Sequence, residues 1–122
     1  MIRIVTESMS DFTQEEAKAA DLIVMPLPIR FGMEEYWDDG VSLTQDDFYA
    51  RLRVAKELPK TSQVPVEHYR KCFNRLLENP EDEVLVITGS SKLSGCYQSA
   101  CIAREACHDP ARVTVLDSLN AT

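Results

Sequence analysis

The sequence predicts an α/β domain with a mainly parallel sheet flanked by helices. Apolar segments of strand length alternate with segments of helix length along the chain, which is typical of such a sheet. Residues 84–87 (Val-Leu-Val-Ile) form an unbroken apolar run, as expected for a strand buried on both faces of a parallel sheet. A polar loop at 88–92 and a predicted helix at 94–108 follow this strand. Ligands of open α/β sheets bind at such turns, where a helix N-terminus favours an anion.

Length and composition indicate one cytoplasmic domain. The chain has 122 residues, of which 44% are hydrophobic, enough for a single domain at 1–122 with a real core. No apolar run approaches the roughly 18 to 20 residues of a membrane span, and the charged start predicts a strand rather than a signal peptide. The formal charge of -7 argues against nucleic acid or anionic membranes as partners, because both require a basic surface.

The first elements expected are a strand at 2–5 and a helix at 13–20. The polar cluster 6–8 follows the strand and is a candidate wall of a binding site. Thr13 is the expected N-cap of the helix, and Glu16 three residues later completes a capping box.

Two further apolar runs, 22–25 and 27–31, are interrupted by Pro26 and Pro28. Proline removes a donor from the sheet ladder, so this region suits strand ends or a sheet edge. The residues that follow, 34–37, predict a small hairpin outside the main parallel sheet.

Two helices are expected in the middle of the chain. The first runs from its N-cap Thr44 to Lys56 and ends before Pro59. The second begins at Pro65 and is strongly amphipathic, with apolar residues at three- and four-residue steps: Val66, Tyr69, Cys72, Phe73, Leu76 and Leu77. Val64 would be a poor N-cap, so we expect a hydroxyl or a ligand to satisfy the first amides of this helix. A last strand is expected at 112–116.

The hydroxyl-rich loops do not match common catalytic or nucleotide-binding patterns. Ser91 lacks the second glycine of a nucleophile elbow, and the segment 89–95 lacks the lysine that follows the second glycine of a P-loop. None of the four cysteines forms a CxxC pair, so we expect reduced thiols rather than metal ligands. Neutral hydroxyls suffice to hold a carboxylate. The alternative to a binding domain is an α/β enzyme domain that acts on a small acyl or phosphorylated substrate.

Three segments carry a resemblance to a known family: SSKLSGCYQSA at 90–100, LPKTSQVP at 58–65 and PLPIRFGMEEYWDDGVSLT at 26–44. In this order they resemble signature blocks of the DegV family of bacterial fatty-acid-binding proteins. The resemblance implies the N-terminal domain of a two-domain carrier that encloses a long-chain fatty acid such as palmitate. It also implies no catalytic activity, no cofactor, and a fatty acid kinase as a partner that receives the acyl chain.

By the same resemblance, two hydroxyls hold the carboxylate of the ligand. They belong to Thr61 of the TSQ block and Ser94 of the SxLSG block, with Ser62 and Gly95 as neighbours. Both hydroxyls must reach one carboxylate, so we expect their oxygens to lie roughly 4 to 6 Å apart, bridged by two hydrogen bonds.

This sequence departs from the family pattern at two residues and in length. Glu7 stands where aspartate is usual and Cys96 where threonine is usual, but neither change removes a head-group ligand. The family's second domain is absent from the sequence, and it would close the ligand tunnel. We therefore expect weaker fatty-acid binding than in a two-domain relative, and self-association through the apolar surface left uncovered.

Overall fold

The structure, a computed structural model, describes residues 1–8, 14–31, 34–37, 45–54, 60–92 and 95–120. The elements in chain order are β1 (Ile2–Glu7), α1 (Gln14–Ala19), β2 (Leu22–Met25), β3 (Pro28–Phe31), β4 (Glu34–Trp37), α2 (Gln45–Val54), β5 (Lys60–Thr61), α3 (Val66–Leu76), β6 (Glu83–Thr88), α4 (Cys96–Ala106), the 3-10 turn η2 (Pro110–Arg112) and β7 (Val113–Asp117). The expected helix caps Thr13 and Thr44 lie outside the described residues.

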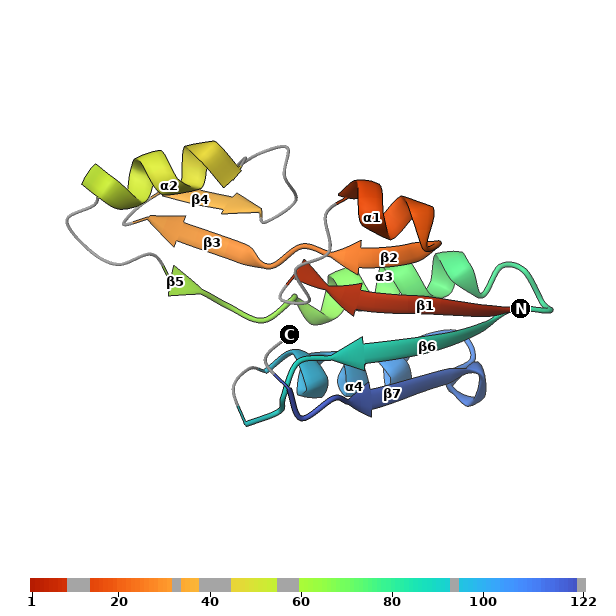
Figure 1. The fold of residues 1–122 in the computed structure, drawn as a ribbon. Helices are drawn as coiled ribbons and strands as arrows, with labels where there is room; N and C mark the ends of the chain where they lie inside the picture. The colour runs from red at the N-terminus through yellow and green to blue at the C-terminus, as the bar shows by residue number, and fades with distance from the viewer. Residues whose placement is uncertain (9–13, 32–33, 38–44, 55–59, 93–94, 121–122) are drawn as a thin grey trace.

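The main sheet has four parallel strands in the order β2-β1-β6-β7 (Figure 1). Val5 of β1 lies between Ile23 of β2 and Val86 of β6. Because all four strands run the same way, their carboxyl ends meet at one edge of the sheet. The prediction of a mainly parallel sheet flanked by helices is confirmed.

One face of the sheet packs against α3 and α4, which lie on the same side of it (Figure 1). The core combines valines of the sheet with aromatic residues of α3 and small residues of α4: Val5, Val84, Val86, Val113, Tyr69, Phe73, Cys96, Ala100 and Ala103. Small side chains on α4 let the two helices approach closely, and the predicted apolar stripe of α3 is the face that packs inward.

The opposite face of the sheet is partly open. Strand side chains alternate between faces, so the residues that point away from α3 and α4 are the alternate set. They include five apolar residues that form what we call the open sheet face: Ile2, Ile4, Leu85, Ile87 and Leu116. Leu116 is 50% exposed, and the others are half-buried or exposed.

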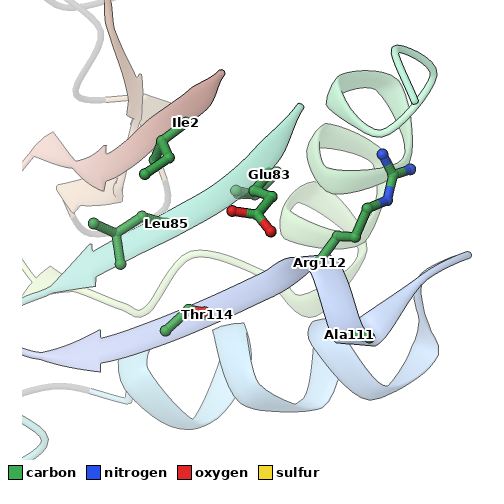
Figure 2. A pocket seen from close by; sticks show the side chains of 7 residues that line it. Ile2, Glu83, Leu85, Ala111, Arg112 and Thr114 are labelled. Atoms are coloured by element: carbon green, nitrogen blue, oxygen red, sulfur yellow. The ribbon is translucent and has the colours of Figure 1, made fainter. Parts of the chain in front are cut away.

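A shallow hollow of about 150 Å³ lies at the amino end of this face (Figure 2). Ile2, Glu83, Leu85, Arg112 and Thr114 are among its lining residues. It is at the end of the sheet opposite to the strand-to-helix turns, so it is not part of the site described below.

A second, antiparallel sheet has the order β4-β3-β5. It confirms the predicted hairpin at 34–37 and places the strand at 28–31 outside the main sheet. The rings of Phe31 and Phe48 lie 5.7 Å apart and join this sheet to α2, while the ring of Trp37 lies 5.0 Å from that of His68 on α3. Residues 60–61, which lie between the two helices expected in the middle of the chain, form the short strand β5, because they pair with Ile29 and Arg30 of β3.

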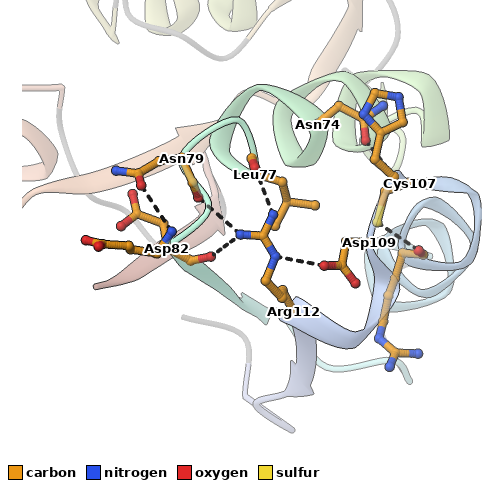
Figure 3. Close-up of polar contacts among 10 residues, drawn as sticks. Asn74, Leu77, Asn79, Asp82, Cys107, Asp109 and Arg112 are labelled. Atoms are coloured by element: carbon orange, nitrogen blue, oxygen red, sulfur yellow. Dashed lines mark hydrogen bonds and ion pairs between the residues drawn. The ribbon is translucent and has the colours of Figure 1, made fainter.

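Arg112 ties the end of α3 to the start of β7 (Figure 3). Its guanidinium donates to the carbonyl oxygens of Leu77 at 2.8 Å, Asn79 at 3.1 Å and Asp82 at 3.0 Å. The Nε atom also donates to Oδ2 of Asp109 at 2.9 Å. Arg112 was expected to begin the last strand, but it closes η2 instead.

Within the described part of the chain, no helix has the length and apolar character to cross a membrane. Nor do its histidine, cysteine and acidic side chains gather in a group of three or more that could hold a metal ion.

Candidate functional site

The candidate site lies at the carboxyl edge of the main sheet, where polar loops follow β1, β6 and β7. The N-terminus of α4 is at this edge because the loop after β6 leads into it. The start of α3 follows β5 of the second sheet and lies beside the start of α4, since the Val64 N–H donates to Sγ of Cys96. This edge is the place where ligands of open α/β sheets bind.

The structure describes the four predicted ligand residues unequally. Thr61 lies in β5 with its backbone paired to Ile29, but its side chain, like the whole of Ser94, lies outside what the structure describes. Ser62 is exposed, and its N–H donates to the carbonyl oxygen of Pro28 at 3.3 Å. The expected approach of the Thr61 and Ser94 hydroxyls therefore stays a prediction.

The neighbours of these residues do meet. The side chain of Gln63 lies over Gly95, so that a methyl group added at Gly95 would come within 3.1 Å of Cδ and 3.3 Å of Oε1 of Gln63. One residue further along each segment, the Val64 N–H donates to Sγ of Cys96 at 3.4 Å. The TSQ block and the start of α4 are thus in direct contact, although they are 32 positions apart in the chain.

Both helices that start at this contact lack a side-chain cap. Pro65 is the N-cap of α3 and Gly95 is the N-cap of α4, and neither position has a side-chain hydrogen bond. The expected N-cap, Val64, is one residue too early, because Pro65 still has extended backbone angles. Uncapped first-turn amides and the positive end of the helix dipole both favour a bound anion.

A buried polar cluster lies behind this contact. Glu7, at the carboxyl end of β1, is 1% exposed. Its Oε1 accepts the Gly89 N–H at 3.0 Å, and its Oε2 accepts the Tyr69 hydroxyl at 3.4 Å. Burial, together with Cys96 and Glu7 nearby, holds the pKa of Tyr69 well above its usual range, so this hydroxyl remains a donor. The cluster connects the ends of β1 and β6 with the first turns of α3 and α4.

The polar cluster after β1 was predicted as a wall of the site, but the burial of Glu7 was not. A carboxylate at a strand end is usually solvated, and its burial here depends on Tyr69, which is 62 positions away in the sequence.

A turn at 117–120 forms the outer rim of this edge. The Ser90 N–H donates to the carbonyl oxygen of Asn120 at 2.9 Å, and the Ser118 N–H donates to that of Thr88 at 3.2 Å. The carboxylate of Asp117 accepts the Ser91 N–H at 3.2 Å. Hydrogen bonding from Ser91, and then from the backbone of Leu119, lowers the pKa of Asp117. Sequence reasoning did not include this turn in the site, although aspartate, serine and asparagine are residues that favour turns.

The four cysteines are free in the structure. Cys72, Cys96 and Cys107 are buried, and Cys101 is half-buried. Burial raises the pKa of the Cys72 thiol. A raised pKa keeps the thiol protonated, which is typical of an unreactive cysteine in a protein core.

Comparison with known proteins identifies the chain's relatives. The model of the DegV family (COG1307), described as a family of uncharacterised proteins, matches residues 1–122. A fatty acid-binding protein of Thermotoga maritima is 35% identical over 128 residues, which cover 99% of this chain and 42% of that protein.

Two solved structures share the fold. A DegV family protein from Thermus thermophilus, described by its fatty acid binding, has a TM-score of 0.84 and is 33% identical in sequence. The match covers 98% of this chain and 41% of the Thermus chain. A stearic acid-binding protein from Eubacterium ventriosum has a TM-score of 0.87 at 31% identity, with 98% and 42% covered.

The chain spans about two fifths of the length of these relatives. The match nevertheless extends from its first residue to its last, and it includes both of the segments that meet at the candidate site. This chain belongs to the DegV family.

Proposed function

We propose that this chain binds a long-chain fatty acid, such as palmitate, by its carboxylate and acts as a non-catalytic carrier. The head group lies between the TSQ block and the start of α4, held by Thr61, Ser62, Ser94 and Gly95. The observation that carries the proposal is the contact of Gln63 with Gly95, together with the bond from Val64 to Cys96. These contacts join the two predicted ligand segments and support a shared head-group location.

The chemistry of that location suits a carboxylate. Two helix N-termini without side-chain caps supply first-turn amides, and each adds roughly half a positive charge. Neutral hydroxyl and amide donors make charge-assisted hydrogen bonds to a carboxylate, which are stronger than bonds between neutral groups. An acidic chain with a formal charge of -7 can bind an anion in this way without a basic surface.

The nature of the tail is supported by the relatives. The Thermotoga, Thermus and Eubacterium proteins are all described by fatty-acid binding, and each is more than 30% identical to this chain. We assign this chain the role of the N-terminal domain of a two-domain carrier, located in the cytoplasm, without a catalytic step of its own. A fatty acid kinase is the partner that we propose for the bound acid.

Native mass spectrometry of the purified chain tests the proposal. We expect a co-purified mass that matches a C16 or C18 fatty acid, and its loss when Thr61 and Ser94 are both replaced by alanine. The Thr114→Ala variant is the control, because Thr114 is an exposed residue at the other end of the sheet. An empty chain that turns over an acyl phosphate would contradict the carrier role and support an enzyme domain.

A further inference from the structure

Glu7 is a buried carboxylate whose position is not explained by stability. Its side chain is 1% exposed, and within the described part of the chain it forms no ion pair. Burial of a carboxylate without a cation is unfavourable, and an apolar side chain of similar size would stabilise the same core better. The partners of this carboxylate therefore indicate a role other than stability.

The two oxygens of Glu7 join two different segments. Oε1 accepts the N–H of Gly89, the first residue after β6, at 3.0 Å. Oε2 accepts the hydroxyl of Tyr69 on α3 at 3.4 Å. Burial, and after it the nearby Cys96 and Glu7, raise the pKa of Tyr69, so the same hydroxyl also interacts with the first residue of α4.

One more hydrogen bond closes these contacts into a ring. The Val64 N–H donates to Sγ of Cys96 at 3.4 Å. The segment between β6 and α4, which includes Ser94, is thus held at both of its ends, and the TSQ block is held three residues after Thr61. We call this set of contacts the positioning ring, and its members are Glu7, Gly89, Cys96, Val64 and Tyr69.

We propose that Glu7 is a positioning residue for head-group binding. It does not touch the ligand, but through the positioning ring it fixes the TSQ block relative to the start of α4, so that donors of both segments reach one carboxylate. Donors that are ordered on folding bind better than mobile ones, because less freedom is lost when the ligand arrives. The inference rests on the proposed function, since it concerns the same head-group location.

Glu7→Met tests this role, because methionine has a similar length but no oxygen acceptor. The affinity of the full chain for palmitate is compared with its affinity for 1-hexadecanol, which has the same tail length and no carboxylate. Both ligands are delivered from a cyclodextrin complex. We expect Glu7→Met to weaken palmitate binding about tenfold and to leave 1-hexadecanol binding unchanged. Damage to the fold would weaken both ligands alike, so the ratio of the two affinities reports on the head group.

Two further variants separate positioning from folding. Glu7→Gln keeps an oxygen that accepts the Gly89 N–H and an amide that can pair with the Tyr69 hydroxyl, so it should restore most of the preference for palmitate. Tyr69→Phe is the milder variant for the case that Glu7→Met does not fold. It removes only the hydroxyl, keeps the ring stacked on Phe73, and should also lower the ratio.

Asp82→Asn is the matched control. Asp82 is another buried carboxylate, 5% exposed, and it lies just before β6 at the opposite end of the sheet, 3.9 Å from Arg3. Its substitution should lower the unfolding temperature without changing the ratio of affinities.

Each outcome decides the question. A wild-type ratio in folded Glu7→Met or in Tyr69→Phe would overturn the inference and leave the proposed function standing. A ratio in Glu7→Gln as low as that in Glu7→Met would also overturn it, because the hydrogen-bond acceptor would not suffice. So would an equal fall in Asp82→Asn, since any buried carboxylate would then have the effect. A wild-type chain without a preference for palmitate over 1-hexadecanol would overturn both the inference and the proposed function.

Discussion

Head-group binding should depend most directly on the side-chain hydroxyls of Thr61 and Ser94. A carboxylate that loses one charge-assisted hydrogen bond loses about 1.5 to 3 kcal/mol, or roughly tenfold to a hundredfold in affinity. We expect this loss for Ser94→Ala and for Thr61→Ala, with little change in the free energy of unfolding. Titration of each variant with palmitate measures it. If both variants bind as tightly as the wild type, the two-hydroxyl clamp is wrong.

Gly95 is a second residue whose substitution should affect binding more than folding. Its φ of -85° suits any residue, so alanine adds no backbone strain there. The added methyl would push the Gln63 side chain away and enter the space beside the first amides of α4. We expect Gly95→Ala to weaken palmitate binding by about tenfold, equivalent to one hydrogen bond.

A double-mutant cycle with Gln63→Ala provides the control for this prediction. Without the Gln63 amide above it, the methyl group introduced by Gly95→Ala has no partner to displace. Additive effects of Gly95→Ala and Gln63→Ala would therefore show that the contact between the two segments does not shape the site.

At the scale of elements, Arg112 is the residue that joins α3 to β7. Three carbonyl oxygens and the Asp109 carboxylate would lose their donor in Arg112→Ala, and the last carbonyls of a helix have no partner within the helix itself. We expect a loss of about 3 kcal/mol in the free energy of unfolding, measured by urea denaturation. Arg112→Lys should recover only part of it, because an ammonium group cannot reproduce the planar fork of the guanidinium.

Arg70→Ala is the matched control for this experiment. Arg70 also pairs with a carboxylate three residues away, Glu67, but on the exposed side of α3. Its removal should barely change the unfolding midpoint. Equal effects of the Arg70 and Arg112 substitutions would contradict the bridging role.

The elements that sequence reasoning identified are those with a strong local pattern. The apolar run 84–87 falls within β6, and the apolar stripe of α3 predicts the residues that are buried there, among them Tyr69 and Phe73. These patterns arise because burial repeats with the period of each element. They allow the sheet and its covering helices to be predicted from the sequence.

The features that were missed depend on residues far apart in the chain. β5 has only two residues, and its strand conformation comes from pairing with β3 rather than from its own composition. The rim at 117–120 and the buried Glu7 belong to the site through bonds to the loop at 88–91 and to Tyr69. No local sequence pattern indicates such partners, so only the three-dimensional structure reveals them.

At the scale of the whole molecule, residues 1–122 tested as a separate domain should bind the ligand with limited affinity, because a single domain covers only one side of it. A C16 acid has about 15 carbons beyond its carboxyl group, and complete burial at roughly 0.8 kcal/mol per CH₂ is worth about 12 kcal/mol before association costs. If only one side of the acyl chain is covered, about half of this burial free energy is lost. A loss of about 6 kcal/mol raises the dissociation constant by about four powers of ten. We expect calorimetry to give a dissociation constant of tens of micromolar for palmitate and this chain, compared with a nanomolar dissociation constant for a two-domain relative. Submicromolar binding by a monomeric chain would show that this domain encloses the tail unaided.

The open sheet face should make the isolated chain self-associate. Parallel sheets are normally covered on both faces, and here Leu116 is 50% exposed beside other apolar side chains. Light scattering is expected to give a mass above that of a monomer, which falls in the variant Leu116→Asp. Ile102→Asp, with a similar exposure on α4, is the control. A strictly monomeric wild type at high concentration would contradict this expectation.

The strand order also has a consequence for folding during synthesis on the ribosome. β1 lies between β2, its near neighbour in the chain, and β6, whose Leu85 pairs with Ile4 of β1. Translation delivers β1 well before β6, so its second partner emerges only after a long stretch of chain has been made. Until then one edge of β1 has unpaired backbone groups and apolar side chains, which is the condition that favours pairing with a wrong strand. Nascent chains of this protein therefore expose a vulnerable strand ahead of its partner, and molecular chaperones that hold β1 during this interval would shield it.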